Sequence, residues 1–407
     1  MSKISCDIAI AGGGAAGLCA AITAKRTDKN AQVVILERLS RCGKKLLATG
    51  NGRCNLSNLN ISPANYHGSV DVKPFLEKSA LVGDFFDSLG ILTHSDSEGR
   101  IYPLSNSAAT VADGLIAQAQ ELGVKIVCDF EISDIRKSSK GFEIISETDT
   151  VLASSAIITA GGCAQKNLGS NGSGFDIAKK LGIKVNEALP VLCPVPVKKT
   201  ELSGLSGIRV KACATLVTDK KSVKSESGEV QFTDNYLSGI CIFNLSGLVV
   251  PERSVISLNL LPDLTKNEVI LAVKSAAEKF SSRTLDWLLS GIFNRKLAVY
   301  IVKRSLKKPL DAKISSLTAD DIKSVSSSIT DLRFSVTKRA SFENAQAVTG
   351  GIDGCEITGR LESKKHNGLF FGGEILDAVG DCGGYNLHFA WLTGIIAGQA
   401  AAERNKR

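Results

Sequence analysis

The sequence predicts an α/β protein in which a parallel sheet is covered by helices and is interrupted by an inserted domain. The first 37 residues alternate strand, glycine-rich turn, helix and strand, which is a βαβ unit. The pattern changes near residue 190, and spacing like that of the beginning returns after residue 340. We therefore expect one discontinuous three-layer domain formed by residues 1–190 and 341–407, and an inserted domain at 191–340.

The elements of the outer domain are predicted from apolar runs and their boundaries. The run "ISCDIAIA" (4–11) is short and ends in glycine, as a buried strand does. An alanine-rich helix follows at 15–28, and a second strand at 31–37. The same criteria predict a helix and a strand within 112–135, strands at 141–147, 152–162 and 368–376, and helices at 172–183 and 388–406.

The inserted domain is predicted to have two parts. Three of the nine prolines lie in "PVLCPVPV" (190–197), and short strand-like runs then alternate with turns to residue 262. We expect this part, 191–262, to be a β-barrel-like module. Helical spacing follows at 263–330, where Thr265 with Glu268 forms a capping box and Thr318 can cap another helix. Strand character returns at 334–351.

Composition limits the class of protein. The 407 residues are 43% apolar and 22% charged, as in globular proteins, and no run of 18 apolar residues or signal-peptide pattern is present. The 11 cysteines are scattered without a CxxC pair, which argues against a disulfide framework, a zinc ribbon or another metal site. We expect a cytoplasmic protein with no membrane partner.

Charge gives no strong indication of a nucleic-acid partner. The net charge is +8, and only 5% of residues are aromatic. The densest basic stretches, "KKSVK" (220–224) and "KRSLKK" (303–308), are interpreted as solvated surface. We therefore expect a small-molecule substrate and no nucleic acid, and the sequence leaves the oligomeric state open.

The segment "AGGGAAGL" (11–18) predicts a Rossmann-like dinucleotide site. Gly12, Gly14 and Gly17 fit GxGxxG between a buried strand and a helix. Gly12 permits the tight turn, Gly14 lets a pyrophosphate approach the backbone, and Gly17 lets the helix pack on the strand. The helix N-terminus offers free N–H groups to the phosphates. Glu37, twenty residues past Gly17, can accept hydrogen bonds from a ribose, which favours FAD or NAD over NADP.

Two later segments favour FAD. The strand "FFGGEILD" (370–377) delivers a carboxylate where an extended ribityl chain would run, and "IITAGG" (157–162) is another strand ending in small residues. The loop "GDCGGYNLHFAW" (380–391) places glycines at a second helix N-terminus, whose partial positive charge can stabilise negative charge on a reduced flavin.

At these residues the chain resembles a family of bacterial two-domain flavoproteins, the BaiN family, which includes a bile-acid enoyl reductase and aminoacetone oxidase. The longest matching stretches are "GKKLLATGNGRCNLSN" (43–58) and "LFFGGEILDAVGDCGGYNLHFAW" (369–391). Shorter ones, such as "GRIYPLSNSAATV" (99–111), "GSNGSGFDIAKKLG" (169–182) and "GEVQFTD" (228–234), extend the resemblance over nearly the whole chain.

The resemblance implies FAD bound across the discontinuous domain. Lys44 and Lys45 would reach the phosphates, residues 48–55 would wrap the ribityl chain and the isoalloxazine ring, and a strand at 126–130 would line the adenine. Together with the glycine motif it assigns FAD contacts to Gly12, Gly14, Ala15, Ala16, Gly17, Glu37, Arg38, Lys44, Lys45, Thr49, Gly50, Asn51, Gly52, Arg53, Cys54, Asn55, Cys128, Phe130, Ala160, Gly161, Gly373, Glu374, Gly384, Tyr385, Asn386 and Leu387.

The chain departs from the family pattern at three positions, of which the first two lie in the inserted domain. Asp234 and Ile240 stand where many relatives have histidine and proline, and Leu361 replaces a common methionine. These departures leave the substrate open rather than the cofactor. Flavin supplies the electron chemistry itself, so few side chains need be catalytic. Tyr236, Tyr102 and His388 are the candidates for proton transfer.

Three functions are compatible with these features. The first is an FAD-dependent reductase that takes hydride from a transiently bound NAD(P)H and reduces a conjugated C=C in an apolar ketone of the steroid or bile-acid type. The second is an FAD-dependent amine oxidase that uses O₂, with Asp234 available to bind an ammonium group. The third is a flavoprotein without catalytic activity that acts through partners.

Overall fold

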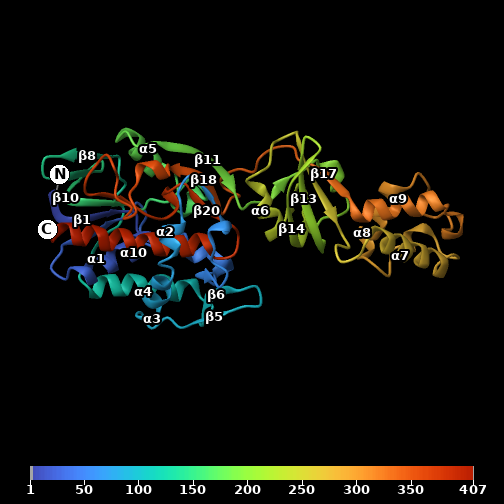
Figure 1. Cartoon of the computed structure of the whole chain (residues 1–407), viewed down its shortest axis with the longest axis horizontal. Coiled ribbons are helices and arrows are strands. Elements are labelled where there is room, and N and C mark those ends of the chain that lie inside the picture. Colours follow the sequence, from blue (N-terminus) through green and yellow to red (C-terminus); the bar gives the residue numbers. More distant parts are fainter. Residues whose placement is uncertain (1–2, 407) are drawn as a thin grey trace. The chain divides into compact units, whose positions relative to one another are not determined.

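The computed structural model describes residues 3–406, which fold into two compact units. Unit 1 comprises Met1–Leu189 and Gln346–Arg407, and unit 2 is Pro190–Ala345. The chain thus re-enters unit 1 at Gln346 rather than at residue 341. Figure 1 shows the course of the chain, and each unit is described by itself.

A mainly parallel sheet forms the centre of unit 1. Its strand order is β7-β2-β1-β10-β9-β8, with β19 also paired to β10, and the ladders of β2 with β7, β1 with β2, β1 with β10 and β10 with β19 are parallel. The strand bounds are β1 Lys3–Ala11, β2 Val33–Leu36, β7 Lys125–Val127, β8 Asp134–Ser138, β9 Gly141–Ile145, β10 Thr150–Ile158 and β19 Leu369–Phe371. The predicted α/β class with a Rossmann-like sheet is confirmed.

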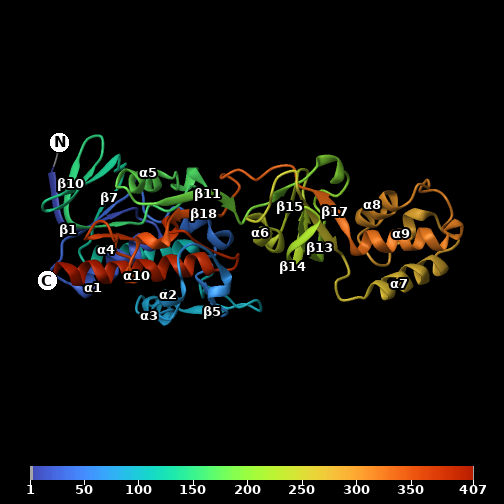
Figure 2. The same ribbon diagram turned by 45° about the horizontal axis from the view of Figure 1, so that its top comes forward.

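Helices cover this sheet on both faces. Helices α1 (Ala15–Thr27), α4 (Ala108–Glu121) and α10 (Tyr385–Asn405) lie on one side, and α5 (Ser173–Lys180) lies on the other (Figures 1 and 2). The smaller elements of unit 1 are β3 Ser57–Asn58, β4 Tyr66–Gly68, β5 Thr93–Ser95, β6 Arg100–Pro103, β11 Val185–Val191, β18 Ala347–Ile352, β20 Ala378–Gly380, α2 Lys73–Leu76 and α3 Ala80–Asp87.

Unit 2 contains a six-stranded sheet and a group of helices. The strand order is β12-β15-β14-β13-β16-β17, with bounds β12 Val195–Pro196, β13 Arg209–Thr218, β14 Lys221–Phe232, β15 Tyr236–Ser238, β16 Ser254–Asn259 and β17 Leu332–Ser335. The helices are α6 Ile240–Ser246, α7 Lys266–Lys279, α8 Arg295–Ser305 and α9 Ala319–Thr330. The expected capping boxes at Thr265 and Thr318 are both formed.

The β part of unit 2 is not a closed barrel. Its outer strands β12 and β17 meet only through a single bridge just beyond their ends, between Val197 and Val336. The sheet and the helices share one apolar core, in which Ile256 and Phe334 of the sheet and Val273 and Ile301 of the helices are fully buried. This shared core makes the β and helical parts a single unit.

None of the helices formed by residues 3–406 is both long and apolar enough to cross a membrane. No cysteine within residues 3–406 forms a disulfide.

Helices α1 and α10 pack backbone to backbone because glycine faces alanine where they cross. A methyl group at Gly394 would lie 2.3 Å from the carbonyl oxygen of Ala16, and one at Gly398 would lie 2.2 Å from that of Ala20. No side chain larger than hydrogen fits at either position without moving the helices apart.

We predict that Gly398→Ala lowers the free energy of unfolding by about 1–3 kcal/mol, because the added methyl group overpacks this contact. Urea unfolding would measure it. Gly83 in α3 is the matched control, since it is exposed and has no neighbour within 4 Å of an added methyl group. Gly83→Ala should gain up to about 1 kcal/mol from helix propensity. Equal effects at the two positions would contradict the close packing of α1 and α10.

Candidate functional site

The three glycines of the fingerprint have different surroundings. A methyl group at Gly12, where φ is +107°, would lie 2.8 Å from the Thr159 carbonyl oxygen, and one at Gly17 would lie 2.0 Å from the carbonyl oxygen of Gly12. The fold itself therefore requires these two glycines. A methyl group at Gly14 would meet no protein atom within 4 Å. The space in front of Gly14, at the N-terminus of α1, is therefore free for a ligand group such as a pyrophosphate.

Glu37 closes one side of the glycine loop. Its Oε2 accepts a hydrogen bond from the Gly13 N–H at 2.8 Å, and its Oε1 accepts one from the Leu39 N–H at 2.9 Å. These bonds hold the carboxylate at the end of β2 beside the helix N-terminus. Each oxygen keeps a further lone pair, so the carboxylate can still accept a ribose hydroxyl.

Glu374 lies in the short 3-10 turn Gly373–Ile375 that follows β19, so the predicted strand 368–376 ends earlier than expected. Only one of its carboxylate oxygens has a partner. The Lys45 ammonium contacts Oε2 at 2.7 Å, and the Gly162 N–H donates to the same oxygen at 3.4 Å. The Oε1 atom is buried and accepts no hydrogen bond within residues 3–406. A hydroxyl donor, such as one of the ribityl chain of FAD, fits this orphaned oxygen.

The segment Thr49–Asn55 turns through an unusual run of left-handed residues. Gly50, Asn51, Gly52 and Cys54 all have φ between +56° and +83°. The Cys54 N–H donates to the Thr49 carbonyl at 3.0 Å, which closes the loop on itself. Successive backbone N–H groups in such a loop form a concave surface that suits an anionic or carbonyl-rich ligand.

The loop before α10 is tied to that segment. With its amide oriented to satisfy both neighbours, Asn55 accepts from the Gly384 N–H at 3.1 Å and donates to the Ser57 carbonyl at 2.9 Å. A methyl group at Gly384 would lie 2.3 Å from the same carbonyl. The Asn386 amide makes two 2.8 Å hydrogen bonds to the backbone of Gly380, so it braces the loop. These contacts bring the loops 49–55 and 380–387 together, as the resemblance implies.

The remaining predicted cofactor residues lie around these loops. Ala15 and Ala16 open α1, and Ala16 faces Gly373. Lys44 is exposed, whereas Lys45 reaches Glu374. The Arg38 guanidinium donates to the Gly169 carbonyl at 3.1 Å. Three further predicted residues, Ala160, Gly161 and Leu387, are partly exposed, and Arg53 is exposed.

The strand predicted at 126–130 is shorter than expected. Strand β7 ends at Val127, because Asp129 takes a left-handed conformation with φ of +55°. Phe130 is buried and donates its N–H to the Glu37 carbonyl at 2.9 Å. Cys128 is partly exposed beside Cys42 and Glu37.

His388 lies in a buried polar contact rather than at an open surface. It is 3% exposed, its Nδ1 lies 2.8 Å from Ser57 Oγ and its Nε2 lies 3.1 Å from Ser79 Oγ. Burial lowers the pKa of the imidazole to about 4. A neutral histidine with both ring nitrogens engaged joins β3 to the start of α3. This geometry favours a structural role over the acid–base role considered from the sequence.

The two tyrosine candidates differ in their surroundings. Tyr102 in β6 is 3% exposed, the Arg53 guanidinium lies 4.7 Å from its ring centroid, and the His94 ring stacks on it at 6.0 Å. Its ring supports the loop that carries Arg53 and Gly50. Tyr236 belongs to unit 2, where its side chain is partly exposed at the start of β15.

The cysteines near the loops are poor nucleophiles. Burial raises the pKa of the Cys54 thiol to about 12 and that of Cys382 to about 11. Both are therefore protonated at neutral pH, which disfavours thiol redox chemistry here. Within residues 3–406, no group of three His, Cys, Asp or Glu side chains is placed to hold a metal ion.

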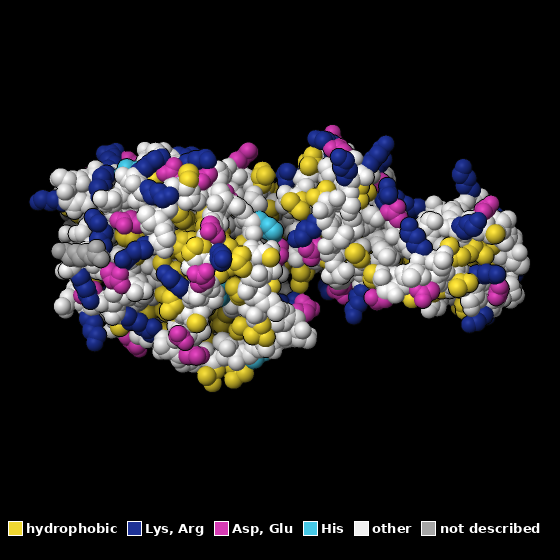
Figure 3. All heavy atoms as spheres, viewed as in Figure 1, with side chains coloured by type: hydrophobic (Ala, Val, Ile, Leu, Met, Phe, Trp, Pro, Cys, Tyr) yellow, Lys and Arg dark blue, Asp and Glu magenta, His cyan; other side chains and the backbone are white. Residues whose placement is uncertain are grey.

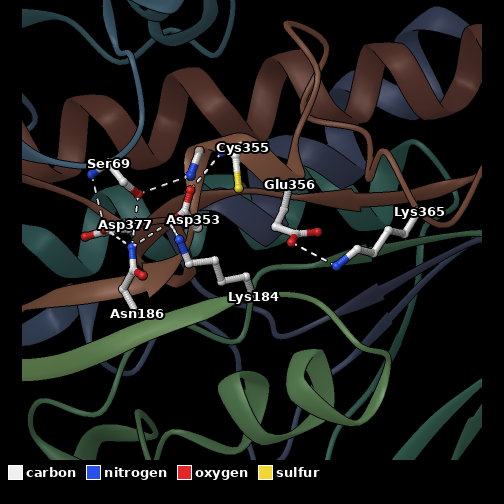
Figure 4. Close-up of polar contacts among 9 residues, drawn as sticks. Ser69, Lys184, Asn186, Asp353, Cys355, Glu356, Lys365 and Asp377 are labelled. Atoms are coloured by element: carbon white, nitrogen blue, oxygen red, sulfur yellow. Dashed lines mark hydrogen bonds and ion pairs between the residues drawn. The ribbon is translucent and has the colours of Figure 1, made fainter.

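A second polar network fastens the strands by which the chain leaves and re-enters unit 1 (Figure 4). The Asn186 amide on β11 donates to Asp377 at 2.7 Å and to Asp353, directly after β18, at 3.1 Å. Asp377 also accepts the Ser69 N–H at 3.1 Å. The Lys184 ammonium, 2.7 Å from Asp353, holds the pKa of that carboxyl well below its ordinary value. Because Asp377 directly precedes β20, the network anchors the loop that follows it.

Comparison with known proteins identifies the family. A family model described as the Rossmann domain of HI0933-like proteins matches residues 6–400. The chain belongs to the HI0933-like family. It is 36% identical over 410 residues to 3-dehydro-bile acid delta(4,6)-reductase of Clostridium scindens, covering 98% of this chain and 99% of the relative. It is 28% identical over 402 residues to the ribosomal RNA dihydrouridine synthase of Escherichia coli, covering 95% of each.

Solved structures share the fold. A 3-ketosteroid-delta4-(5alpha)-dehydrogenase from Rhodococcus jostii RHA1 superposes with a TM-score of 0.51 at 15% identity, covering 98% of this chain and 97% of that one. A quinol–fumarate reductase superposes with a TM-score of 0.53 at 13% identity, covering 100% of this chain and 72% of that one. The HI0933-like chain is thus an FAD-binding oxidoreductase, and the resemblance found in its sequence is confirmed.

Sequence reasoning missed residues that support the loops. Thr159 donates its hydroxyl to the Gly12 carbonyl at 2.9 Å, Asn58 donates to the Gly383 carbonyl at 2.9 Å, and Tyr66 donates to the Tyr385 carbonyl at 3.0 Å. Thr159 and Asn58 lie within stretches that carried the resemblance, so proximity to a motif was the available signal. Tyr66 lies in a segment with no recognisable pattern.

We predict that Gly14→Val yields a folded but colourless protein. Gly14 has extended backbone angles that valine adopts, and its side chain would enter free space where the pyrophosphate is expected. Purified protein would be assayed by flavin absorbance and thermal unfolding. Gly359→Val is the matched control, because Gly359 is exposed and also has no neighbour within 4 Å. A Gly14 variant that retains stoichiometric flavin would show that the pyrophosphate binds elsewhere.

We predict that His388 makes stability depend on pH between about 4 and 6.5. In this window the unfolded chain binds a proton at His388 and the folded chain does not, so acidification favours unfolding by up to about 1.4 kcal/mol per pH unit. Urea unfolding of wild type and His388→Gln at pH 7 and pH 5 would measure this. The variant should lose less stability on acidification. Identical losses would show that the imidazole is already charged in the fold.

Proposed function

We propose that the protein reduces a C=C bond conjugated with a carbonyl group, using hydride that a nicotinamide delivers to its bound flavin. The observation that carries this proposal is the full-length similarity, at 36% identity, to a bile-acid delta(4,6)-reductase. The second relative, a dihydrouridine synthase, carries a name with the same chemistry, since the C5=C6 bond of uridine is conjugated with a carbonyl. A cyclic enone of the steroid type is the first candidate substrate.

The geometry of unit 1 supports this chemistry. Bound FAD would accept hydride from one face and pass it to an electron-poor carbon. Gly14 and Glu37 would hold its adenosine half, and the orphaned Oε1 of Glu374 would accept a ribityl hydroxyl. Gly383 and Gly384, with φ of +136° and +102°, allow the backbone at the N-terminus of α10 to lie close to the ring. The partial positive charge of that helix end would stabilise the reduced cofactor.

The α-carbon of the substrate also needs a proton after hydride transfer. Tyr102 is covered by Arg53 and His94, whereas Tyr236 is partly exposed. Tyr236 is therefore our candidate for the general acid. The alternative function, amine oxidation, has less support, because it rests on Asp234 as a group that could bind an ammonium ion.

A second candidate substrate is a uracil base in RNA. The distribution of charge favours it, because unit 2 has 23 lysines and arginines against 15 acidic residues, whereas unit 1 has 26 of each. The whole-chain value of +8, on which the expectation of no nucleic acid rests together with the low aromatic content, averages over the two units.

We predict that NADH or NADPH bleaches the visible flavin band in an anaerobic titration of the holoprotein. A preference between the two would identify the nicotinamide. If neither bleaches the band, and amines do so with release of peroxide under air, the protein is an amine oxidase and the proposed reductase function is wrong.

We predict that Tyr236→Phe slows reoxidation of the reduced flavin by an enone by about 10²-fold or more, as loss of a general acid does. Flavin reduction by the nicotinamide should keep its wild-type rate, because no proton from Tyr236 enters that step. Tyr102→Phe is the matched control and should alter the enone step much less. The reverse order of effects would assign the proton to Tyr102.

A further inference from the structure

The positive charge of unit 2 is concentrated in one stretch of chain. Residues 287–310 contain six lysines and arginines and no aspartate or glutamate. Helix α8 lies within this stretch and buries Leu297, Ala298, Ile301 and Val302 against the core. Its remaining face, with the residues that follow it, carries the charge. On the face of the molecule drawn in Figure 3, lysine and arginine side chains lie over both parts of unit 2, with acidic side chains among them.

Three lysines of this face are not neutralised. Lys296, Lys303 and Lys307 are exposed, and no carboxylate of residues 3–406 lies within ion-pair distance of them. Lys296 and Lys303 are seven residues apart, which places them on one face about 10 Å apart along the helix. By contrast, the flanking Arg295 and Lys308 are paired with Asp286 and Asp321. We call Lys296, Lys303, Arg304 and Lys307 the α8 stripe.

Helix stability explains only part of the stripe, because Lys303 and Arg304 lie in the last turn of α8 but Lys296 does not. Lysine and arginine in the last turn are favourable for a helix, but Arg295 and Lys296 occupy the first turn, where the helix dipole disfavours cations. No acidic residue offsets them within that turn. Lys296 is thus the residue of the stripe that breaks the local rule, and such exceptions are expected at functional sites.

Neighbouring groups extend the stripe. The Arg304 guanidinium donates to the Arg333 carbonyl at 2.7 Å and to the Tyr300 hydroxyl at 2.6 Å, and Tyr300 donates to the Glu201 carbonyl at 2.5 Å. Helix α8 is thereby joined to the segment that contains the exposed Lys198 and Lys199.

An exposed aromatic residue lies near the other end of α8. Trp287 is 39% exposed, and the Arg283 guanidinium lies 5.0 Å from its ring. The adjacent Asp286 pairs with Arg295 in the first turn of α8 at 3.0 Å. Lysines beside an exposed aromatic ring offer both phosphate contacts and a surface on which a base can stack.

We propose that the α8 stripe binds the phosphate backbone of RNA. A polyanion with stackable bases matches both the uncompensated lysines and Trp287, whereas an apolar ketone would make no use of either. This inference rests on the proposed function, because a uracil base in RNA as the substrate would explain why the protein binds RNA. The docking itself is independent of which acceptor the flavin reduces.

The test uses the holoprotein and a fluorescein-labelled RNA hairpin with a uridine-containing loop, followed by fluorescence anisotropy from 50 to 300 mM KCl. We expect K296Q/K303Q/K307Q to weaken binding about tenfold or more and to reduce the slope of log K against log salt by about 2–3. The matched control is K73Q/K78Q/K140Q, which removes three exposed lysines from unit 1. It should change affinity less than about twofold.

Each other outcome overturns the inference. If the wild-type protein does not bind the hairpin at 50 mM KCl, RNA docking is excluded. If both triple variants bind equally weakly, the affinity depends on net charge and not on the α8 stripe. Binding to vesicles of phosphatidylcholine and phosphatidylglycerol but not to RNA would assign the stripe to a membrane surface. Nicotinamide-dependent flavin reduction is measured in the same variants. If the nicotinamide does not reduce the flavin of the wild-type protein, the proposed reductase function is wrong. If a stripe variant no longer binds RNA but its flavin is still reduced, RNA binding is independent of the redox chemistry.

Discussion

The structure of unit 1 depends on one constraint, the close approach of helix α1 to backbone on both of its sides. Gly17 lets α1 pack directly against the turn at Gly12, because a methyl group at Gly17 would lie 2.0 Å from the Gly12 carbonyl oxygen. On its other side, α1 lies against Gly394 and Gly398 of α10 with equally little room. The N-termini of both helices are thereby fixed with respect to the sheet. These are the two ends that we assign to the pyrophosphate and to the flavin ring, so the contacts that shape the fold also place the site.

Polar contacts connect the remaining segments around the site. Lys45 and Glu374 join segments 329 positions apart in sequence, and Asn55 joins the 49–55 loop to Gly384. The network of Asn186, Asp353 and Asp377 fastens β11 and β18 to β20. Glu374 Oε1 alone among these carboxylate atoms is buried without a partner. A buried carboxylate oxygen without a protein donor at this position suits a hydroxyl donor such as a sugar-like chain.

Much of the fold was predictable because its signals are local. The run 4–11, the glycine motif and the capping residues Thr265 and Thr318 each depend on neighbours in sequence, and each was placed correctly. The predictions were wrong where contacts between residues far apart in sequence determine the structure. Strand β7 ends early at Asp129, and the sheet of unit 2 does not close. The catalytic role of His388 stays a prediction, and its contacts with Ser57 and Ser79, which come from segments far away in sequence, could not be foreseen from its place beside the loop.

The charge of the protein is likewise informative only when it is assigned to each unit and not averaged over the whole chain. The net charge of the whole chain is modest, and "KRSLKK" (303–308) by itself has the composition of ordinary solvated surface. Once the chain is divided into units, the excess lies entirely in unit 2, and the exposed face of α8 shows which of its cations are uncompensated. Unit 1 thus carries the features of a redox site, and unit 2 carries those of a surface for an anionic partner.

The most direct measurement of the central claim is a single-turnover reoxidation. Holoprotein reduced anaerobically would be mixed with a cyclic enone, and in parallel with the uridine-containing hairpin, while the visible flavin band and the mass of the acceptor are followed. The account predicts that the band returns without oxygen and that the acceptor gains two hydrogens. Reoxidation by oxygen alone, with neither acceptor changed, would contradict reduction of a carbonyl-conjugated C=C bond.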